Sequence, residues 1–375
     1  MSGNDMTGVD WRELLGRSSE MEIIDPPAGL HRDQCVFISG AGGSIGCALT
    51  MRLAELQSRL LLLLDASEQN LYELDARLKR LASPVFYVAV LGSICDNGLL
   101  DELCAQYRPE MLYHAAAHKH VPLMESNPLA VVRNNALGTY RLVQAAVRNR
   151  IRHMLMVSTD KAVRPASIMG ASKRMAELAL LGCATASTRM TCVRLGNVLG
   201  SQGSVAGVFL DQIARGDSVT VTHRDAERYF FTMEEAVCLI LGAASATQDK
   251  QILVPDTGRP TKILDLANNL IQRKGQPPGG PAIVFTGLRP GEKLYEEFVG
   301  PGERLAAWVG PRLHAIDGPA IQEETLHRAM RDLDAAVCAR NLQGVLQAIE
   351  RLVPEYRPSA SLEAKHSEPV AGHHA

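Results

Sequence analysis

The chain has 375 residues and a mass of 40.7 kDa, enough for one large domain or two domains, which excludes a small disulfide-stapled module. Hydrophobic residues make up 46% and charged residues 21%, a composition that excludes disorder over most of the length. Lys and Arg total 39 against 41 for Asp and Glu, so no global basic field exists to hold nucleic acid or anionic lipid. An anionic ligand must therefore be bound by local geometry.

The sequence predicts a cytoplasmic protein without a membrane span. No uninterrupted apolar run approaches the ~18 residues that a span needs, and the richest run is Leu60 to Leu64. The segment from Met1 to Asp10 is polar and lacks the apolar region of a secretory leader. The eight Cys occur singly, without CxxC or zinc-ligand spacing, which favours reduced thiols over a disulfide framework.

From about residue 32 onward, short apolar runs alternate with helical patterns. The predicted strands are 35–39, 61–64, 85–91, 111–114, 154–158 and 192–195. The predicted helices are a short one at 10–16, then 45–56, 68–81, 128–148 and 168–181. Apolar strands separated by helices predict a parallel sheet covered on both faces, a Rossmann-type doubly wound α/β fold. After residue 199 the pattern loosens, with isolated runs at 252–254 and 283–285, which predicts a smaller α/β lobe.

A glycine-rich turn directly follows the first predicted strand. Gly40, Gly43 and Gly46 keep a GxxGxxG spacing, which lets the backbone approach a pyrophosphate at a helix N-terminus. Asp65 closes the second strand nineteen residues after Gly46, where an acid can hydrogen-bond a ribose diol. The pattern predicts a dinucleotide site and favours NAD. NADP stays open as an alternative because basic residues follow on the next helix, namely Arg77, Lys79 and Arg80.

A second group of polar residues ends the fifth predicted strand. Thr159, Asp160 and Lys161 offer a hydroxyl, a carboxylate and an ammonium at the edge where open α/β sheets place their ligands. These side chains suffice for general acid and base work. Met169 and Lys173 follow at i and i+4 on one face of the next predicted helix.

These two motifs and their spacing resemble the extended short-chain dehydrogenases/reductases. More narrowly, the chain resembles the UDP-N-acetylglucosamine 4,6-dehydratases of the polysaccharide-biosynthesis type over about residues 32–299. The matching stretches are GAGGSIG, LYHAAAHKHVP, NNALGT, STDKAVRPASIMGASKR, RLGNVLGSQGSV and TGLRPGEKLYEE, of which STDKAVRPASIMGASKR is the most specific. DWRELLGR at 10–17 also resembles the join between the membrane and catalytic parts of longer members, so we expect a soluble form of the catalytic portion.

The resemblance implies an enzyme, an NAD-dependent hydro-lyase, and a division of the chain into parts. These are a helix and linker at 1–31, an NAD(P)-binding Rossmann domain at 32–198 to which about 230–256 return, a mainly nucleotide-sugar-binding lobe at 199–358 and a flexible tail at 359–375. The implied cofactor-binding residues are Gly40, Gly43, Ser44, Ile45, Gly46, Asp65, Ser67, Ser93, Ile94, Ala115, Ala116, Asn135 and Lys173. The implied residues for UDP-N-acetylglucosamine, whose diphosphate suits forked Arg donors, are Lys119, Asn197, Ser204, Val205, Arg228, Arg289 and Glu292.

The implied reaction is an internal redox cycle with net loss of water. A hydride leaves sugar C4 for NAD⁺ and returns to C6, while Lys161 removes the C5 proton and Asp160 protonates the departing C6 hydroxyl. Thr159 binds or relays the C4 hydroxyl proton, and Lys173 binds the nicotinamide ribose. These roles require a lowered pKa for Lys161 and a raised pKa for Asp160, and a closed site beside cationic Lys173 favours the first.

Met169 occupies the position of the catalytic Tyr in the reductase pattern YxxxK, and it cannot move a proton. Long members of the dehydratase subfamily also carry Met there, and Asp160 and Lys161 still supply an acid and a base. We therefore favour an active enzyme over a pseudoenzyme. Ser167 stands where an Asn is commoner, a departure that concerns substrate positioning nearby.

Several alternatives remain open. They are the same chemistry with C5 epimerisation, a GDP-linked or non-acetamido sugar, a simple 4-epimerase, and a catalytically inactive regulator that senses NAD(H). His114, His118 and His120 have no carboxylate at ligand spacing, so no metal site is predicted. We expect a homo-oligomer, as among relatives, with no nucleic-acid partner.

Overall fold

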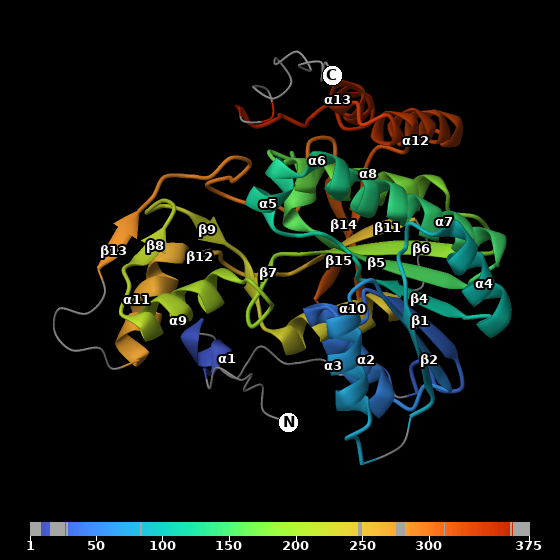
Figure 1. The fold of residues 1–375 in the computed structure, drawn as a ribbon, viewed down its shortest axis with the longest axis horizontal. Helices are drawn as coiled ribbons and strands as arrows, with labels where there is room; N and C mark the ends of the chain where they lie inside the picture. The colour runs from blue at the N-terminus through green and yellow to red at the C-terminus, as the bar shows by residue number, and fades with distance from the viewer. Residues whose placement is uncertain are drawn as a thin grey trace, which may run out of the picture.

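The computed structural model describes residues 9–15, 27, 29–82, 85–246, 250–274, 282–310, 312–360 and 362. Its main feature is a nine-stranded sheet in the order β14-β15-β11-β6-β5-β4-β1-β2-β3 (Figure 1). The strands are β1 (Cys35–Ser39), β2 (Leu60–Asp65), β3 (Tyr87–Leu91), β4 (Met111–His114), β5 (His153–Thr159), β6 (Arg189–Leu195), β11 (Gln251–Pro255), β14 (Arg304–Gly310) and β15 (Leu313–Asp317). All pair in parallel from β3 to β11, and β15 and β14 add an antiparallel edge. The predicted doubly wound fold is confirmed.

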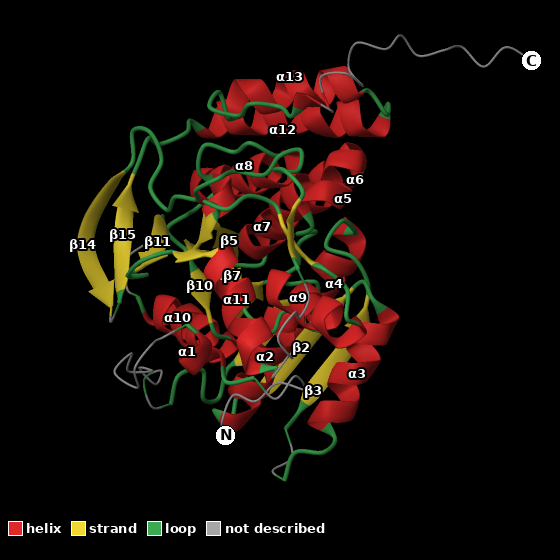
Figure 2. Ribbon diagram, turned by 90° about the vertical axis from the view of Figure 1, so that its left-hand side faces the viewer, coloured by secondary structure: helices red, strands yellow, loops and turns green. Residues whose placement is uncertain are grey.

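Both faces of the sheet are buried under helices, as the continuous apolar strands predict. In β1, Phe37 packs into one core, whereas Val36 and Ile38 pack into a second core on the opposite face. One face carries α2 (Ser44–Glu55), α3 (Glu68–Leu78) and α10 (Met233–Ser245), and the other carries α4 (Asn97–Tyr107), α7 (Thr139–Arg148) and α8 (Ile168–Gly182) (Figure 1). Two further helices, α12 (Glu323–Cys338) and α13 (Leu342–Leu352), form an outer layer over α8 (Figure 2).

The strand order places the predicted motifs at one edge of the sheet. β1 lies between β2 and β4, so the direction of winding reverses between β1 and β4. In open α/β sheets, ligands bind outside the carboxyl ends of the strands at such a reversal. β1 ends at Ser39, β4 at His114 and β5 at Thr159, so the glycine turn and the Thr159–Lys161 group emerge at this edge.

The segment predicted as one helix at 128–148 is helical throughout but not uniform. It consists of α6 (Pro128–Val131), a π-helical segment η1 (Val132–Gly138) and α7. π-helical segments are rare and frequently occur at functional sites. The apolar spacing of this stretch does not reveal the π-helical segment, because it also fits an ordinary helix. Helix α4 was also not predicted.

A third core lies beside the main sheet. It is built from α1 (Trp11–Leu14), α9 (Val205–Arg215) and α11 (Ile263–Arg273), around residues such as Phe209 and Leu270. Three small sheets accompany it, pairing β7 (Asn197–Val198) with β10 (Phe230–Phe231), β9 (Glu227–Arg228) with β12 (Thr261–Lys262), and β8 (Val219–Val221) with β13 (Ile283–Phe285).

The domain boundaries remain a prediction. Two segments that the sequence assigned to the smaller lobe contact the main sheet or its helices instead. Residues 304–317 and 323–352, which the sequence assigned to the smaller lobe, extend the main sheet or pack over α8. Their strands pair antiparallel, so the alternation of strand and helix that marks the earlier chain is lost there. Most of the predicted linker and tail, at 16–26 and 363–375, lies outside the described residues.

Candidate active site

The glycine turn after β1 depends on close backbone packing. Gly40 has a φ of 72°, and a Cβ there would lie 2.5 Å from the backbone N of Ala116. A Cβ at Gly46 would lie 2.0 Å from the carbonyl oxygen of Gly40. Helix α2 begins at Ser44, and no side chain among the described residues caps its N-terminus. These features fit a bound pyrophosphate, which would accept hydrogen bonds from the helix N–H groups.

Asp65 supports the turn from the end of β2. Its side chain is buried, Oδ2 accepts a hydrogen bond from Gly42 N at 2.8 Å, and Oδ1 accepts one from Ser67 N at 2.8 Å. Carboxylate oxygens accept more than one hydrogen bond each, so capacity remains for ribose hydroxyls. The turn and Asp65 together therefore fit a dinucleotide such as NAD.

The other predicted cofactor residues lie on segments that follow the same strands. They are Ser44 and Ile45 in α2, Ser67 before α3, Ser93 and Ile94 after β3, and Ala115 and Ala116 after β4. Ile94 is buried, and its Cδ1 would lie 2.9 Å from a Cβ at Gly138 in η1.

Asn135 holds the segment after β4 against α8. Its Oδ1 accepts a hydrogen bond from His118 N at 2.8 Å. Its Nδ2 donates to His118 O at 2.9 Å and to Ser172 Oγ at 3.1 Å. Asn135 lies in the π-helical segment, so this local irregularity positions a residue of the predicted cofactor site.

His114 lies buried between two hydroxyls rather than among ligands for a metal. Its Nδ1 is 2.8 Å from Ser39 Oγ and its Nε2 is 2.8 Å from Thr139 Oγ1. Burial, with a smaller contribution from Lys173, holds the pKa of His114 well below its usual value, so the ring is neutral. In the part of the chain that the structure describes, no group of three or more His, Cys, Asp or Glu side chains could hold a metal ion.

The predicted acid and base form a close pair in the short 3₁₀ helix η2 (Asp160–Ala162). Lys161 Nζ lies 2.9 Å from Asp160 Oδ1 and 3.0 Å from Asn197 Oδ1. Thr159 Oγ1 donates to the same Asp160 Oδ1 at 2.9 Å. Asp160 is fully buried, and its Oδ2 has no hydrogen-bond partner among the described residues. A buried carboxylate oxygen without a partner is costly, which indicates a group that a ligand completes.

The charge state of Lys161 differs from the sequence-based expectation. Burial lowers the pKa of Lys161, but the nearby carboxylates of Asp160 and Glu296 outweigh burial, and the pKa is raised above its usual value. The expected lowering is therefore wrong for this arrangement, because the sequence does not reveal Glu296 at this site. Lys161 is an ammonium group here.

The lysine of this site with a lowered pKa is Lys173, not Lys161. Its side chain is buried on α8, and Nζ donates to Val157 O at 2.8 Å. Burial lowers the pKa of Lys173 to about 8, against smaller opposite contributions from Glu177 and Cys192. Met169 is buried one turn earlier in the same helix and packs in the core.

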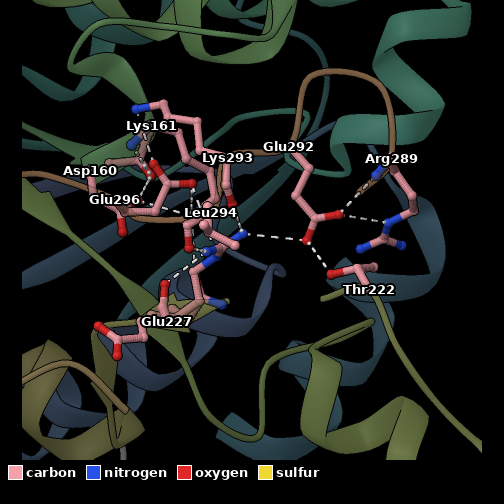
Figure 3. Close-up of polar contacts among 12 residues, drawn as sticks. Asp160, Lys161, Thr222, Glu227, Arg289, Glu292, Lys293, Leu294 and Glu296 are labelled. Atoms are coloured by element: carbon pink, nitrogen blue, oxygen red, sulfur yellow. Dashed lines mark hydrogen bonds and ion pairs between the residues drawn. The ribbon is translucent and has the colours of Figure 1, made fainter. Parts of the chain in front are cut away.

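Glu292 contacts Arg289 and Arg228, which were also predicted to bind the substrate, and Thr222, which was not (Figure 3). Its Oε2 accepts from Arg289 N at 3.2 Å and lies 3.4 Å from Arg289 Nε. Its Oε1 accepts from Thr222 Oγ1 at 3.1 Å and from Arg228 Nη2 at 3.3 Å. Arg289 is 58% exposed at its side chain, so its remaining donors are available to an anion.

Arg228 is buried, and most of its donors contact the protein. Nη1 donates to Glu227 O at 2.7 Å and Leu294 O at 3.0 Å, and Nη2 donates to Lys293 O at 2.6 Å. Arg228 therefore fixes the 293–296 segment to β9. Its predicted contact with the nucleotide stays a prediction.

Three further predicted residues lie farther along the same edge. Lys119 Nζ donates to Ser201 Oγ at 3.3 Å, and burial lowers the pKa of Lys119. Ser204 caps α9, whose first residue is Val205, through a 3.4 Å hydrogen bond from Gly207 N. The backbone N of Gln202 donates to Ser44 Oγ at 3.0 Å, so this loop contacts the start of α2.

Sequence reasoning missed Glu296. Its carboxylate lies 3.8 Å from Lys161 Nζ and 3.2 Å from Lys293 Nζ, with a side chain that is 3% exposed. The available signal was the matching stretch TGLRPGEKLYEE, which contains it. In the sequence, the adjacent Glu296 and Glu297 look like two solvated surface residues. Only the fold shows that Glu296 is buried and that Glu297 is more exposed.

Residues 36–316 match the family described as "Polysaccharide biosynthesis protein". The chain belongs to this family. It is 39% identical over 315 residues to the "Probable polysaccharide biosynthesis protein EpsC" of Bacillus subtilis, covering 83% of this chain and 53% of that protein. It is also 39% identical over 306 residues to the "Capsular polysaccharide biosynthesis protein CapD" of Staphylococcus aureus, covering 80% of this chain and 51% of that protein. This family member thus spans about half the length of these curated relatives.

Solved structures share the fold of this polysaccharide biosynthesis family member. Pen from Bacillus thuringiensis matches with a TM-score of 0.69 at 24% identity, covering 80% of this chain and 98% of that one. DesIV from Streptomyces venezuelae, a dTDP-glucose 4,6-dehydratase with NAD and TYD bound, matches with a TM-score of 0.61 at 20% identity, covering 71% and 88%. None of the helices described here is both long and apolar enough to cross a membrane.

Proposed function

We propose that this chain is an NAD-dependent nucleotide-sugar 4,6-dehydratase that acts on UDP-N-acetylglucosamine. The observation that carries the proposal is the pair of buried Asp160 and partly buried Lys161 at the carboxyl end of β5, in which Asp160 Oδ2 lacks a hydrogen-bond partner among the described residues. Met169 replaces the tyrosine, so acid and base must come from this pair. The similar fold of a dTDP-glucose 4,6-dehydratase that binds NAD supports the reaction class and the cofactor.

The cofactor, when bound, would accept a hydride from sugar C4 and return it to C6. The protein's own residues move the protons. Transfer of one proton along the 2.9 Å contact from Lys161 Nζ to Asp160 Oδ1 converts an ammonium and a carboxylate into an amine and a carboxylic acid. These are the two forms that elimination requires.

The proton transfers of the elimination and of the later reduction at C6 then balance. The Lys161 amine takes the C5 proton, and Asp160 gives its proton to the C6 hydroxyl, which leaves as water. When C6 is reduced, Lys161 returns a proton to C5. The pair is then one proton short. It takes one proton from solvent, which replaces the proton that the C4 hydroxyl released to solvent through Thr159 when C4 was oxidised. Thr159 Oγ1 lies 2.9 Å from Asp160 Oδ1.

Mass spectrometry of UDP-N-acetylglucosamine incubated with the protein and NAD⁺ tests the proposal. We expect a product lighter by one water, and a loss of turnover of about 10²-fold or more in Asp160→Asn and in Lys161→Ala. Glu297→Gln, on the exposed side of the same segment, serves as the control and keeps its turnover. Near wild-type turnover in Asp160→Asn would contradict the assignment.

Further measurements determine the C5 configuration of the product, the sugar nucleotide and the cofactor. NMR in D₂O reports the C5 configuration together with deuterium at C5, and so separates retention from C5 epimerisation. Parallel assays with GDP-linked sugars and with NADP⁺ test the remaining alternatives. The cytoplasmic location and the homo-oligomer stay predictions from the sequence.

A further inference from the structure

Glu296 lies after the turn at Arg289 and points its carboxylate into the protein (Figure 3). Its Oε1 is 3.8 Å from Lys161 Nζ and 4.0 Å from Arg228 Nε, and its Oε2 is 3.2 Å from Lys293 Nζ. A carboxylate with 3% exposure is stable as an anion only among positive charges. The Glu296 carboxylate therefore lies among three cationic side chains, within 4 Å of Lys161.

Glu296 is the second carboxylate at Lys161, after Asp160. Burial alone favours the neutral amine and would lower the pKa of Lys161, and the two carboxylates together raise it. During elimination Asp160 must itself become protonated, and it then loses its charge. Glu296 takes no part in that exchange, so it still lies beside Lys161 when Asp160 is protonated.

This inference rests on the proposed function, in which the pair must hold one shared proton. We propose that Glu296 is a positioning residue that keeps this proton on the buried Asp160–Lys161 pair. Without Glu296, the effect of burial on Lys161 would favour loss of the proton, and Asp160 would have none to give to the leaving hydroxyl. Arg228 and Lys293 surround the carboxylate of Glu296 with positive charge.

The groups that face the pair come from several segments. Asn197 from β7 accepts from Lys161, and Arg228 from β9 lowers the pKa of Lys161. Tyr229, next to Arg228, has a raised pKa because of burial, Glu227 and then the charge of Asp160. Removing the charge of Glu296 leaves all of these in place, so any change in the titration of Lys161 reports on Glu296.

The test is the pH titration of Lys161 in Glu296→Gln. Protein labelled with [ε-¹³C]lysine is titrated by NMR without substrate, and the resonance is assigned with Lys161→Arg. We expect Lys161 to lose its proton at a pH lower than in the wild type by about 1 to 3 units. The alkaline limb of the pH profile for dehydration moves in the same direction. Glu297→Gln removes the adjacent, exposed carboxylate that pairs with Arg164, and both curves stay unchanged.

Glu296→Asp keeps the charge and moves it away by one methylene, so we expect an intermediate titration. This variant replaces Glu296→Gln as the test if the Gln variant fails to fold. An unchanged Lys161 titration in the folded variants overturns the inference. Because the titration needs no turnover, a shifted titration in a protein that dehydrates no sugar nucleotide would contradict the proposed function and leave the charge effect of Glu296 established.

Discussion

Asp160 is fully buried, and one of its oxygens has no hydrogen-bond partner in the part of the chain that the structure describes, which supports the proposed reactivity of the pair. Thr159 and Lys161 both contact Oδ1, so Oδ2 is the oxygen that the proposed substrate would reach. In water, solvent molecules would hydrogen-bond both oxygens of such a carboxylate. The fold instead holds it at the end of β5, where a substrate oxygen can complete its hydrogen bonding.

The buried amine of Lys173 makes the stability of the protein depend on pH. The folded chain releases this proton at a pKa of about 8, against a value of 10.5 when exposed. Between these two pH values the unfolded chain binds more protons at Lys173 than the folded chain does, so the contribution of Lys173 to the free energy of unfolding rises with pH. Between pH 8 and 10.5, we expect the free energy of unfolding of the wild type to rise by about 3 kcal/mol relative to that of Lys173→Met.

Urea unfolding of the two proteins at several pH values measures this difference. Buried thiols and tyrosines that titrate in the same range are common to both proteins and cancel. A gap between wild type and Lys173→Met that does not change with pH would show that Lys173 is not held as a buried, easily deprotonated amine.

At the scale of elements, a buried ion cluster joins β6, α8 and the turn before β14. Arg194 is fully buried and contacts Glu177 Oε2 at 2.8 Å and Glu303 Oε2 at 2.6 Å. Arg174 contacts the same two carboxylates at 2.9 Å and 3.0 Å. Ser158, which precedes Thr159, donates to Glu177 at 2.6 Å. The cluster therefore anchors the strand end that carries the acid–base pair.

We expect Glu303→Gln to lower the free energy of unfolding by about 3 to 5 kcal/mol, because it leaves a buried guanidinium with one counter-charge. Asp101→Asn, which breaks the half-exposed pair with Arg148, is the matched control and should cost about 0 to 1 kcal/mol. Denaturant unfolding measures both, and equal costs would mean that the cluster is not an anchor.

The sequence predicted elements well where the signal is local. The strand at 111–114 and the start of the helix at 168 agree with β4 and α8, because an apolar run and a Ser cap mark them. The π-helical segment could not be predicted, since its apolar spacing fits an ordinary helix. The glycine turn and the Thr159–Lys161 group were found because strand ends carry polar residues at fixed places.

At the scale of the whole molecule, the site depends on contacts between distant parts of the chain. Glu296 reaches Lys161, and Glu303 reaches Arg194, from segments that follow β13. No local pattern records such pairings, so the charge state of Lys161 could not be predicted. The antiparallel edge of β15 and β14 escaped prediction for the same reason, because the pairing is not recorded in either strand alone.

Deuterium tracing tests the central claim most directly. UDP-N-acetylglucosamine labelled with deuterium at C4 is incubated with the protein and NAD⁺, and the product is read by mass spectrometry and NMR. The dehydratase assignment predicts a 4-keto product that has lost one water and carries the deuterium in its C6 methyl group. A C4 epimer that retains all its oxygen and has deuterium at C4, or unchanged substrate, would contradict it.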